Sequence, residues 1–217
     1  MKFKIKKNLL LEALNNVSKA ISSKNIIPIL SGIKVEVLSD KLILTASDND
    51  VTIQTVLESS DNLIINSTGS IVIKGKYILD IIRKLDEDFV NVEIVDDHKI
   101  MIYTENSEFS LNGIDIKEYP QIDLTLSSDI ISLPVNEVKN MIAQTNYATS
   151  MDEARVVLTG VNIKISDKLL ECSATDSYRL ALKKINLSDS FQKLVDIIIP
   201  SKIINKYIPN LVKSILS

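Results

Sequence analysis

The chain carries the same sequence pattern twice. LSGIKVEVLSDKLILTASD occupies residues 30–48, and LTGVNIKISDKLLECSATD occupies residues 158–176. Each stretch begins with leucine, a hydroxyl residue and glycine, continues as an alternating strand, passes Ser-Asp-Lys-Leu and ends on aspartate. Gly32 and Gly160 lie 128 residues apart, as do Asp48 and Asp176. Because this spacing matches the size of a domain, we interpret the pattern as a domain duplication.

The predicted elements around the two stretches occur in the same order. The first copy begins with a helix whose apolar residues recur at spacings of three and four, namely Leu10, Leu14, Val17 and Ile21. Alternating strands follow, then a second helix over residues 74–86, then three more strands. The same order of helix, strands and helix begins again near residue 131.

This order predicts an α+β fold in which tandem copies of one domain each pack two helices on antiparallel sheets. The first copy is expected to form a complete domain over residues 1–124. The second copy, over residues 125–217, lacks the strands that follow the second helix in the first copy. We therefore expect the second domain to be incomplete.

Composition is that of a globular protein, with 45% apolar and 24% charged residues. No apolar run approaches the ~18 residues that a membrane span needs, and the basic start of the chain is interrupted too early for a signal peptide. The single cysteine, Cys172, cannot form an internal disulfide. These features predict a cytoplasmic protein without a membrane partner.

None of the motifs considered in the sequence fits a catalytic, phosphate-binding or calcium-binding site. His98 is the only histidine and lies in a polar turn next to aspartates, so it offers no base for a nucleophile. The segment GSIVIKGK, residues 69–76, has five residues between its glycines, and its middle is predicted to be a strand, so it is no phosphate-binding loop. Asp48 and Asp50 lack the glycine and glutamate of a calcium loop. The sequence predicts a protein with no catalytic residues, no metal and no cofactor.

Positive charge is concentrated on the predicted helices. The four helix windows, residues 6–24, 74–86, 134–150 and 200–216, hold 12 basic and 4 acidic residues, whereas the whole chain has a net charge of −3. Basic helices on an acidic protein attract phosphates, while the acidic remainder of the protein repels them. Because no aromatic or Arg/Asn/Gln cluster stands out on these helices, we expect contact with a nucleic-acid backbone and no choice of sequence.

Several strings of the chain are similar to those of the bacterial beta sliding clamp family, the processivity subunit of DNA polymerase III. The similarity covers the whole chain and is strongest in FSLNGIDIKEYPQI, ARVVLTGVNIKI and ATDSYRLALKK. The resemblance implies the DNA-clamp fold and identifies residues 1–124 and 125–217 with its first and central domains. By this resemblance, the third domain of the family is expected to be absent from residues 1–217.

The resemblance also implies a function. Two full-length subunits of the family form a ring around double-stranded DNA, with helices lining the hole, and tether the polymerase without catalysing a reaction. The implied partners are duplex DNA, the DNA polymerase III catalytic subunit, the clamp loader, other replication and repair proteins that carry clamp-binding peptides, and a second copy of the full-length chain.

The resemblance assigns roles to particular residues. It places Lys24, Arg83, Arg155, Lys202 and, on the same last helix, Lys206 on the DNA-facing surface. It places the pocket for partner peptides at Leu158, Thr175, Ser177, Tyr178, Arg179 and Leu180. It assigns Phe109, in the strand SEFSLNG, to the edge at which two subunits meet.

Two residues depart from the family pattern. Many members have histidine where Tyr178 stands, so the peptide preference is expected to differ, and Pro209 interrupts the last predicted helix. The alternative, taken from the residues alone, is a β-rich protein-interaction scaffold that does not bind DNA. In that case TDSYRL would be a simple turn with a half-buried tyrosine.

Overall fold

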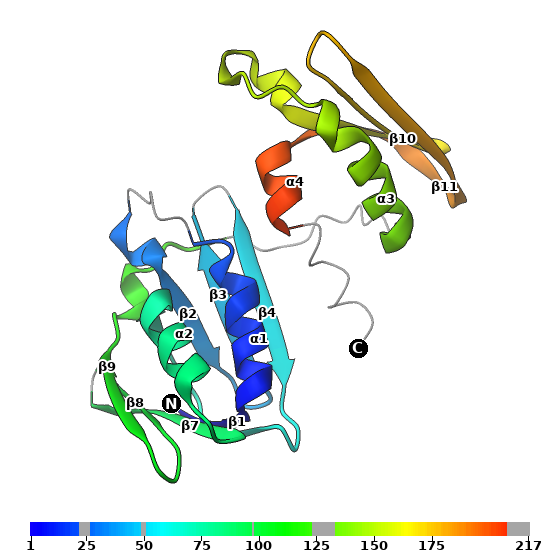
Figure 1. The fold of residues 1–217 in the computed structure, drawn as a ribbon. Coiled ribbons are helices and arrows are strands. Elements are labelled where there is room, and N and C mark those ends of the chain that lie inside the picture. Colours follow the sequence, from blue (N-terminus) through cyan, green and yellow to red (C-terminus); the bar gives the residue numbers. More distant parts are fainter. Residues whose placement is uncertain (22–26, 49–50, 97, 123–132, 208–217) are drawn as a thin grey trace. The chain divides into compact units, whose positions relative to one another are not determined.

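The structure, a computed structural model, describes residues 1–21, 27–48, 51–96, 98–122 and 133–207. The chain divides into two units, Met1–Leu124 and Thr125–Ser217. Figure 1 shows that both units contain paired helices and antiparallel strands. None of the helices in the described ranges is long and apolar enough to cross a membrane.

The described part of the first unit contains two antiparallel sheets. One has five strands in the order β5, β1, β7, β8 and β9, which span Leu63–Ser67, Lys2–Lys6, Phe89–Asp96, Lys99–Tyr103 and Glu108–Asn112. The other has four strands in the order β4, β3, β2 and β6, which span Thr52–Glu58, Lys41–Ser47, Gly32–Val37 and Gly69–Lys74. Strand β6 covers the segment that resembles a phosphate loop, which confirms the rejection of that motif.

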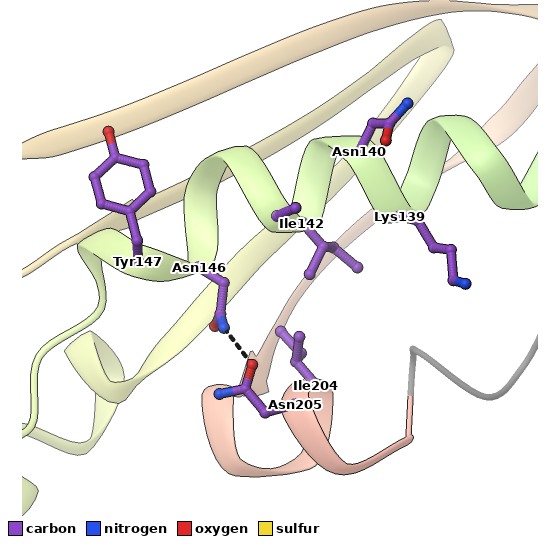
Figure 2. Close-up of a pocket in the computed structure, with 8 residues that line it drawn as sticks. Lys139, Asn140, Ile142, Asn146, Tyr147, Ile204 and Asn205 are labelled. Atoms are coloured by element: carbon purple, nitrogen blue, oxygen red, sulfur yellow. Dashed lines mark hydrogen bonds between the residues drawn. The ribbon is translucent and has the colours of Figure 1, made fainter.

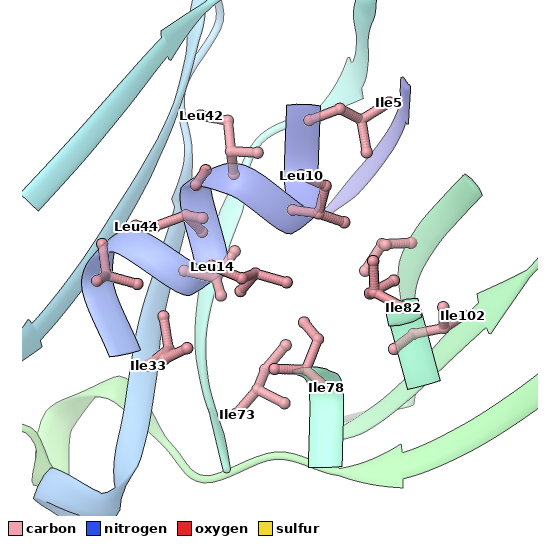
Figure 3. Close-up of a cluster of buried hydrophobic side chains, with 14 of the residues drawn as sticks. Ile5, Leu10, Leu14, Ile33, Leu42, Leu44, Ile73, Ile78, Ile82 and Ile102 are labelled. Carbon is pink, nitrogen blue, oxygen red and sulfur yellow. The ribbon is translucent and has the colours of Figure 1, made fainter. Parts of the chain in front are cut away.

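Helices α1 (Lys7–Ser18) and α2 (Gly75–Lys84) contact each other and pack on the two sheets. Leu10, Leu14 and Val17 of the predicted stripe are buried in this core, whereas Ile21 follows the end of α1 and is half-buried. Ile78 and Ile82 of α2 are buried in the same core (Figure 3). Along β2 the buried residues alternate with Lys34 and Glu36, which point to the opposite face of the sheet. The helices therefore cover one apolar face of this sheet. The other face carries Lys34 and Glu36 and also the buried Val72, which packs with Ile29, Leu30 and Tyr119.

The second unit contains two helices and a long antiparallel strand pair in its described part. Helix α3 (Val135–Thr145) precedes strands β10 (Gly160–Thr175) and β11 (Leu180–Pro200), and helix α4 (Ser201–Tyr207) follows them. Met141 and Ile142 of α3 and Ile204 of α4 share a buried cluster with the strands. Pro209 lies outside the described residues.

The strand registers repeat between the units and confirm the predicted tandem fold. Helices α1 and α3 begin 128 residues apart, at Lys7 and Val135. The pair Ser47↔Thr52 that closes β3 and β4 corresponds to Thr175↔Leu180, and Gly32↔Lys74 corresponds to Gly160↔Pro200. The offset is 128 residues as far as the start of β11 and 126 at its end, so the second copy is two residues shorter between these points.

Strand β10 corresponds to two strands of the first unit, β2 and β3. It bends at Asp167, which has a φ of 52° and lies between two register shifts in the pairing with β11. The bend lies at the position equivalent to residues 38–40, which connect β2 to β3 in the first unit. The duplication thus explains why a single assigned strand carries the pattern of a whole hairpin.

Candidate partner-binding site and nucleic-acid interface

The turn between β10 and β11 is held by one carboxylate. The Oδ1 atom of Asp176 accepts hydrogen bonds from the backbone N–H groups of Tyr178 and Arg179, both at 3.0 Å, and its Oδ2 lies 2.9 Å from Nε of Arg179. The N–H of Tyr178, followed by the N–H and side chain of Arg179, lowers the pKa of Asp176. Ser177 completes the turn in the left-handed region at φ 80°.

A second turn of the same kind lies next to the first. Asp152 accepts a hydrogen bond from the N–H of Ala154 at 3.0 Å and lies 3.6 Å from Nε of Arg155. Arg155 also donates a hydrogen bond from Nη1 to Oγ of Ser177 at 3.0 Å. Arg155, which the resemblance places on the DNA-facing surface, is therefore bonded to a residue of the predicted peptide pocket.

Large apolar side chains are exposed around these two turns. Tyr178 is 96% exposed and Met151 95%, and Val156, Val157 and Leu180 are also exposed. Thr175 lies at the end of β10, and Leu158 is half-buried at the end of the 3-10 helix Glu153–Thr159 that precedes it. Such a group of exposed apolar residues marks an interaction surface. A merely structural tyrosine at position 178 would be half-buried, and the observed exposure contradicts that alternative.

The site also includes residues that the sequence analysis did not identify. Met151, Val156 and Val157 lie in the segment MDEARVV, where apolar residues follow no helical or strand period, and this irregularity is the signal that could have revealed them. Tyr147 lies after α3, and its ring centre is 5.5 Å from the guanidinium carbon of Arg179. Nothing in the sequence near Tyr147 points to this contact.

A pocket of about 460 Å³ lies between α3 and α4 (Figure 2). Within it, Nδ2 of Asn146 donates a hydrogen bond to Oδ1 of Asn205 at 2.8 Å, while the Oδ1 atom of Asn146 is buried without a partner among the described residues. The floor is apolar, from Ile142 and Ile204. Tyr147 also lines the pocket and contacts Arg179, so this pocket adjoins the partner-binding residues.

The helices differ in charge within each unit. Within the bounds that the structure gives, α1 and α3 each carry one basic and one acidic residue, so both are neutral. Helix α2 carries Lys76, Arg83 and Lys84 against Asp80, and α4 carries Lys202 and Lys206 without an acidic residue. The positive charge assigned to all four helices therefore belongs to the second helix of each unit and to the flanking segments.

The predicted DNA-facing residues are exposed where the structure describes them. Arg83 donates a hydrogen bond to Oδ1 of Asn15 at 2.8 Å, which links α2 to α1. Lys202 forms an ion pair with Glu153, and Nζ of Lys206 lies 5.3 Å from the ring centre of Tyr207. Both lysines remain exposed, and surface pairs of this kind contribute little to stability. Lys24 lies outside the described residues.

Phe109 lies on β9, the outermost strand of the five-stranded sheet, and is 37% exposed. Within the described residues, β9 pairs only with β8, so its other edge presents unpaired backbone groups. An exposed edge of this kind can pair with a strand of another domain.

The described residues offer little reactive chemistry. They contain no group of three or more histidine, cysteine or acidic side chains that could hold a metal ion, and His98 is exposed in the connection between β7 and β8. Cys172 is buried, and burial raises the pKa of its thiol to about 11. A buried thiol with a raised pKa is a poor nucleophile.

Two helices packed on antiparallel sheets, repeated in one chain, define the class of DNA-clamp folds. Comparison with protein families agrees: the model of the DNA polymerase III beta subunit N-terminal domain matches residues 1–123, and that of the central domain matches residues 132–213. The chain belongs to the DNA polymerase III beta subunit family.

Individual relatives support this assignment. The beta sliding clamp of Staphylococcus epidermidis is 39% identical over 95% of this chain and 55% of its own length. The crystal structure of the Bacillus subtilis sliding clamp matches with a TM-score of 0.91 and 37% identity, and that of the Streptococcus pneumoniae beta chain with 0.91 and 33%. Both structural matches cover 96% of this chain and 56% of the other. The chain spans about half the length of the relatives it matches.

Proposed function

We propose that this chain is the N-terminal and central part of a sliding clamp, a non-catalytic processivity factor that holds a DNA polymerase on duplex DNA. Membership of the beta subunit family supports the proposal, and the charge of the second helices is the observation that carries it. Five exposed basic residues on α2 and α4 stand against one acidic residue. Helices of this charge attract the phosphates of nucleic acids, which carry no sequence information.

The proposal assigns DNA contact to Arg83, Lys202 and Lys206, together with Lys24 and Arg155. It adds Lys76, because Lys76 and Lys202 occupy the same place in the second helix of their units, 126 residues apart. The repeat is the signal that identifies this residue. A scaffold that does not bind DNA has no need to place a basic residue at the equivalent position of α2 and α4, so this repetition favours the clamp.

A charge-reversal experiment tests DNA contact. Arg83→Glu, Lys202→Glu and Lys206→Glu, combined in one variant, should weaken binding to duplexes of different sequence equally, because phosphates carry no sequence information. The slope of log affinity against log salt should flatten by roughly one per lost phosphate contact. Fluorescence anisotropy with labelled duplexes at several salt concentrations measures both quantities.

The matched control reverses Lys34, Lys41 and Lys164, which lie on strands and point away from the helices. Both variants change the net charge equally, so the control should bind DNA nearly as well as the original chain. Equal loss in both variants would show that only the net charge matters and would contradict a DNA-facing helical surface.

The second half of the proposal concerns protein partners. Leu158, Thr175, Ser177, Tyr178, Arg179 and Leu180 would accept short peptides with apolar anchors from the polymerase, the clamp loader and other replication or repair proteins. The exposed apolar side chains around the two aspartate turns support this role. At full clamp length the chain would form a homodimeric ring through β9, and a protein acting on chromosomal DNA in this way would work in the cytoplasm.

A further inference from the structure

Tyr147 contacts the partner-binding residues from a separate element. It belongs to the 3-10 helix Asn146–Ala148 that follows α3, and its side chain is 60% exposed. Figure 2 shows the ring projecting away from the hydrogen bond between Asn146 and Asn205. At 5.5 Å from its centroid to the guanidinium carbon of Arg179, the ring makes a cation–π contact.

Arg179 is held on two sides and keeps donors available. Its Nε atom is bonded to Asp176, and the ring of Tyr147 lies against its guanidinium group. Its two terminal nitrogen atoms have no hydrogen-bond partner among the residues that the structure describes, whereas Arg155 already donates from Nη1 to Ser177. A guanidinium group fixed in this way is a preformed fork for a carboxylate.

The first unit shows that the turn does not need this contact. At the 128-residue offset, Tyr147 and Arg179 correspond to Lys19 and Val51. The N–H of Val51 still donates a hydrogen bond to Oδ1 of Asp48 at 2.9 Å, as the N–H of Arg179 does to Asp176 at 3.0 Å. The turn therefore forms without an aromatic ring or an arginine, and the pair is specific to the unit that carries the partner site.

We propose that Tyr147 is a positioning residue of the partner site, which holds Arg179 so that the site selects peptides with a carboxylate next to an apolar anchor. The inference rests on the proposed peptide-binding function. The exposed side chains of Tyr178 and Leu180 flank Arg179 in the sequence, so an apolar anchor and a carboxylate can bind close together. A bound peptide would shield Arg179 from water, and this shielding strengthens the charged hydrogen bonds between Arg179 and the peptide carboxylate.

The test compares two synthetic peptides on the whole 217-residue chain. Both contain a glutamine followed by leucine and phenylalanine anchors, and they differ only in having aspartate or asparagine beside the phenylalanine. The original chain should prefer the aspartate peptide, and Tyr147→Leu should reduce that preference by about two- to fivefold. In Tyr147→Leu the affinity for the asparagine peptide should fall less than the affinity for the aspartate peptide, and Tyr147→Phe, which keeps the ring, should keep the preference. Isothermal titration calorimetry measures the six affinities of the three proteins for the two peptides.

A second measurement needs no peptide. In the free protein, NMR signals of the Arg179 side chain should shift upfield relative to those in Tyr147→Leu, because the ring current of Tyr147 acts on them. Absence of this shift, or an equal loss of both peptides in Tyr147→Leu, overturns the positioning role. If the original chain binds neither peptide, the proposed peptide site itself is wrong and the carboxylate preference is wrong with it, even where the NMR shift is present.

Discussion

At the scale of single residues, Gly32 and Gly160 show what the duplication preserves. A Cβ atom at Gly32 would lie 2.5 Å from Cγ1 of Val72, and one at Gly160 would lie 2.7 Å from Cγ2 of Ile198. Val72 and Ile198 are themselves equivalent, 126 residues apart on β6 and β11. In both units the first residue of the strand lies so close to a branched side chain of the neighbouring strand that only glycine fits.

Replacing Gly32 should therefore destabilise the first unit. Gly32→Ala is expected to lower the free energy of unfolding by about 1–3 kcal/mol, because the methyl group overpacks the contact with Val72. Val72→Ala removes the clashing atom, so the double variant should lose less than the sum of the two single variants. Urea unfolding of all four proteins measures the coupling, and additive effects within about 0.5 kcal/mol would contradict the clash.

Tyr119 provides a test at high pH. It is buried with Ile29, Leu30 and Val72, and burial raises its pKa to about 12 against a smaller opposing effect of the Ser47 backbone. Because the folded pKa exceeds the unfolded value of about 10, this group stabilises the fold below pH 10 and loses that effect as the pH rises toward 12.

Tyr119→Phe removes this pH dependence. At pH 8 the free energy of unfolding of the variant should differ from that of the original chain by about 1 kcal/mol or less, because the substitution removes one neutral hydroxyl. Between pH 9 and pH 11 the original chain should lose about 1 kcal/mol more than the variant. Urea unfolding at both pH values gives the comparison, and parallel pH profiles would show that Tyr119 ionises as freely in the folded state as in the unfolded state.

How far single residues could be predicted depends on whether their role is local. Asp176 is identifiable because an aspartate ahead of a turn accepts the N–H groups of the next residues, and the turn lies within four positions of the chain. Tyr147 was missed because its partner, Arg179, lies on another element, and only folding brings them together. The exposure of Met151 also could not be predicted, because it depends on tertiary packing and not on the neighbouring residues in the sequence.

At the scale of elements, the helices were predicted well because their apolar stripes face the core. Leu10, Leu14 and Val17 are buried as the period of 3.6 residues requires. Charge was predicted less well, because windows drawn from periodicity include flanking residues that do not belong to the helix. The first window, residues 6–24, includes Lys6, Lys19 and Lys24, which lie outside α1, whereas the window of α3 is already neutral in the sequence.

The contact between the paired helices also differs between units. Asn146 and Asn205 of the second unit stand where the first unit has Ser18 and Leu79. Ser18 satisfies its hydroxyl by donating to the carbonyl of Asn15 at 3.0 Å, and Leu79 is buried. Asn146, in contrast, keeps a buried oxygen without a partner among the described residues.

Replacing Asn146 and Asn205 by the equivalent residues of the first unit should stabilise the second unit. Asn146→Ser combined with Asn205→Leu removes the unpaired oxygen and fills part of the pocket between α3 and α4, for an expected gain of about 1 kcal/mol. Asn205→Leu alone should be less favourable, because it leaves Nδ2 of Asn146 without its acceptor. Chemical denaturation measures both variants, and a double variant less stable than the original would show that the polar pair is better packed than the apolar one.

At the scale of the whole molecule, the two edges of the five-stranded sheet differ. Phe109 on β9 and Ile64 on β5 are exposed apolar residues at opposite edges of the sheet. The clamp proposal gives a subunit interface only to β9. The resemblance supplied this assignment, because a sequence read alone does not say which edge strand remains unpaired.

In a chain extended to full clamp length, Phe109→Asp should weaken dimer formation at least about tenfold, as expected for loss of a central apolar contact. Ile64→Asp is the matched control and should leave the dimer intact. Sedimentation velocity over a range of concentrations measures the dissociation constant. An equal effect of the two substitutions would place the interface elsewhere.

The burial of Cys172 has a practical consequence for watching this protein at work. Its thiol is 1% exposed and carries a raised pKa, so maleimide dyes at neutral pH should leave the folded chain almost unlabelled. A cysteine introduced at an exposed strand position such as Ser188 would then take up a single fluorophore without removal of the native one. Labelling of this kind would allow the proposed movement along DNA to be tested with single molecules.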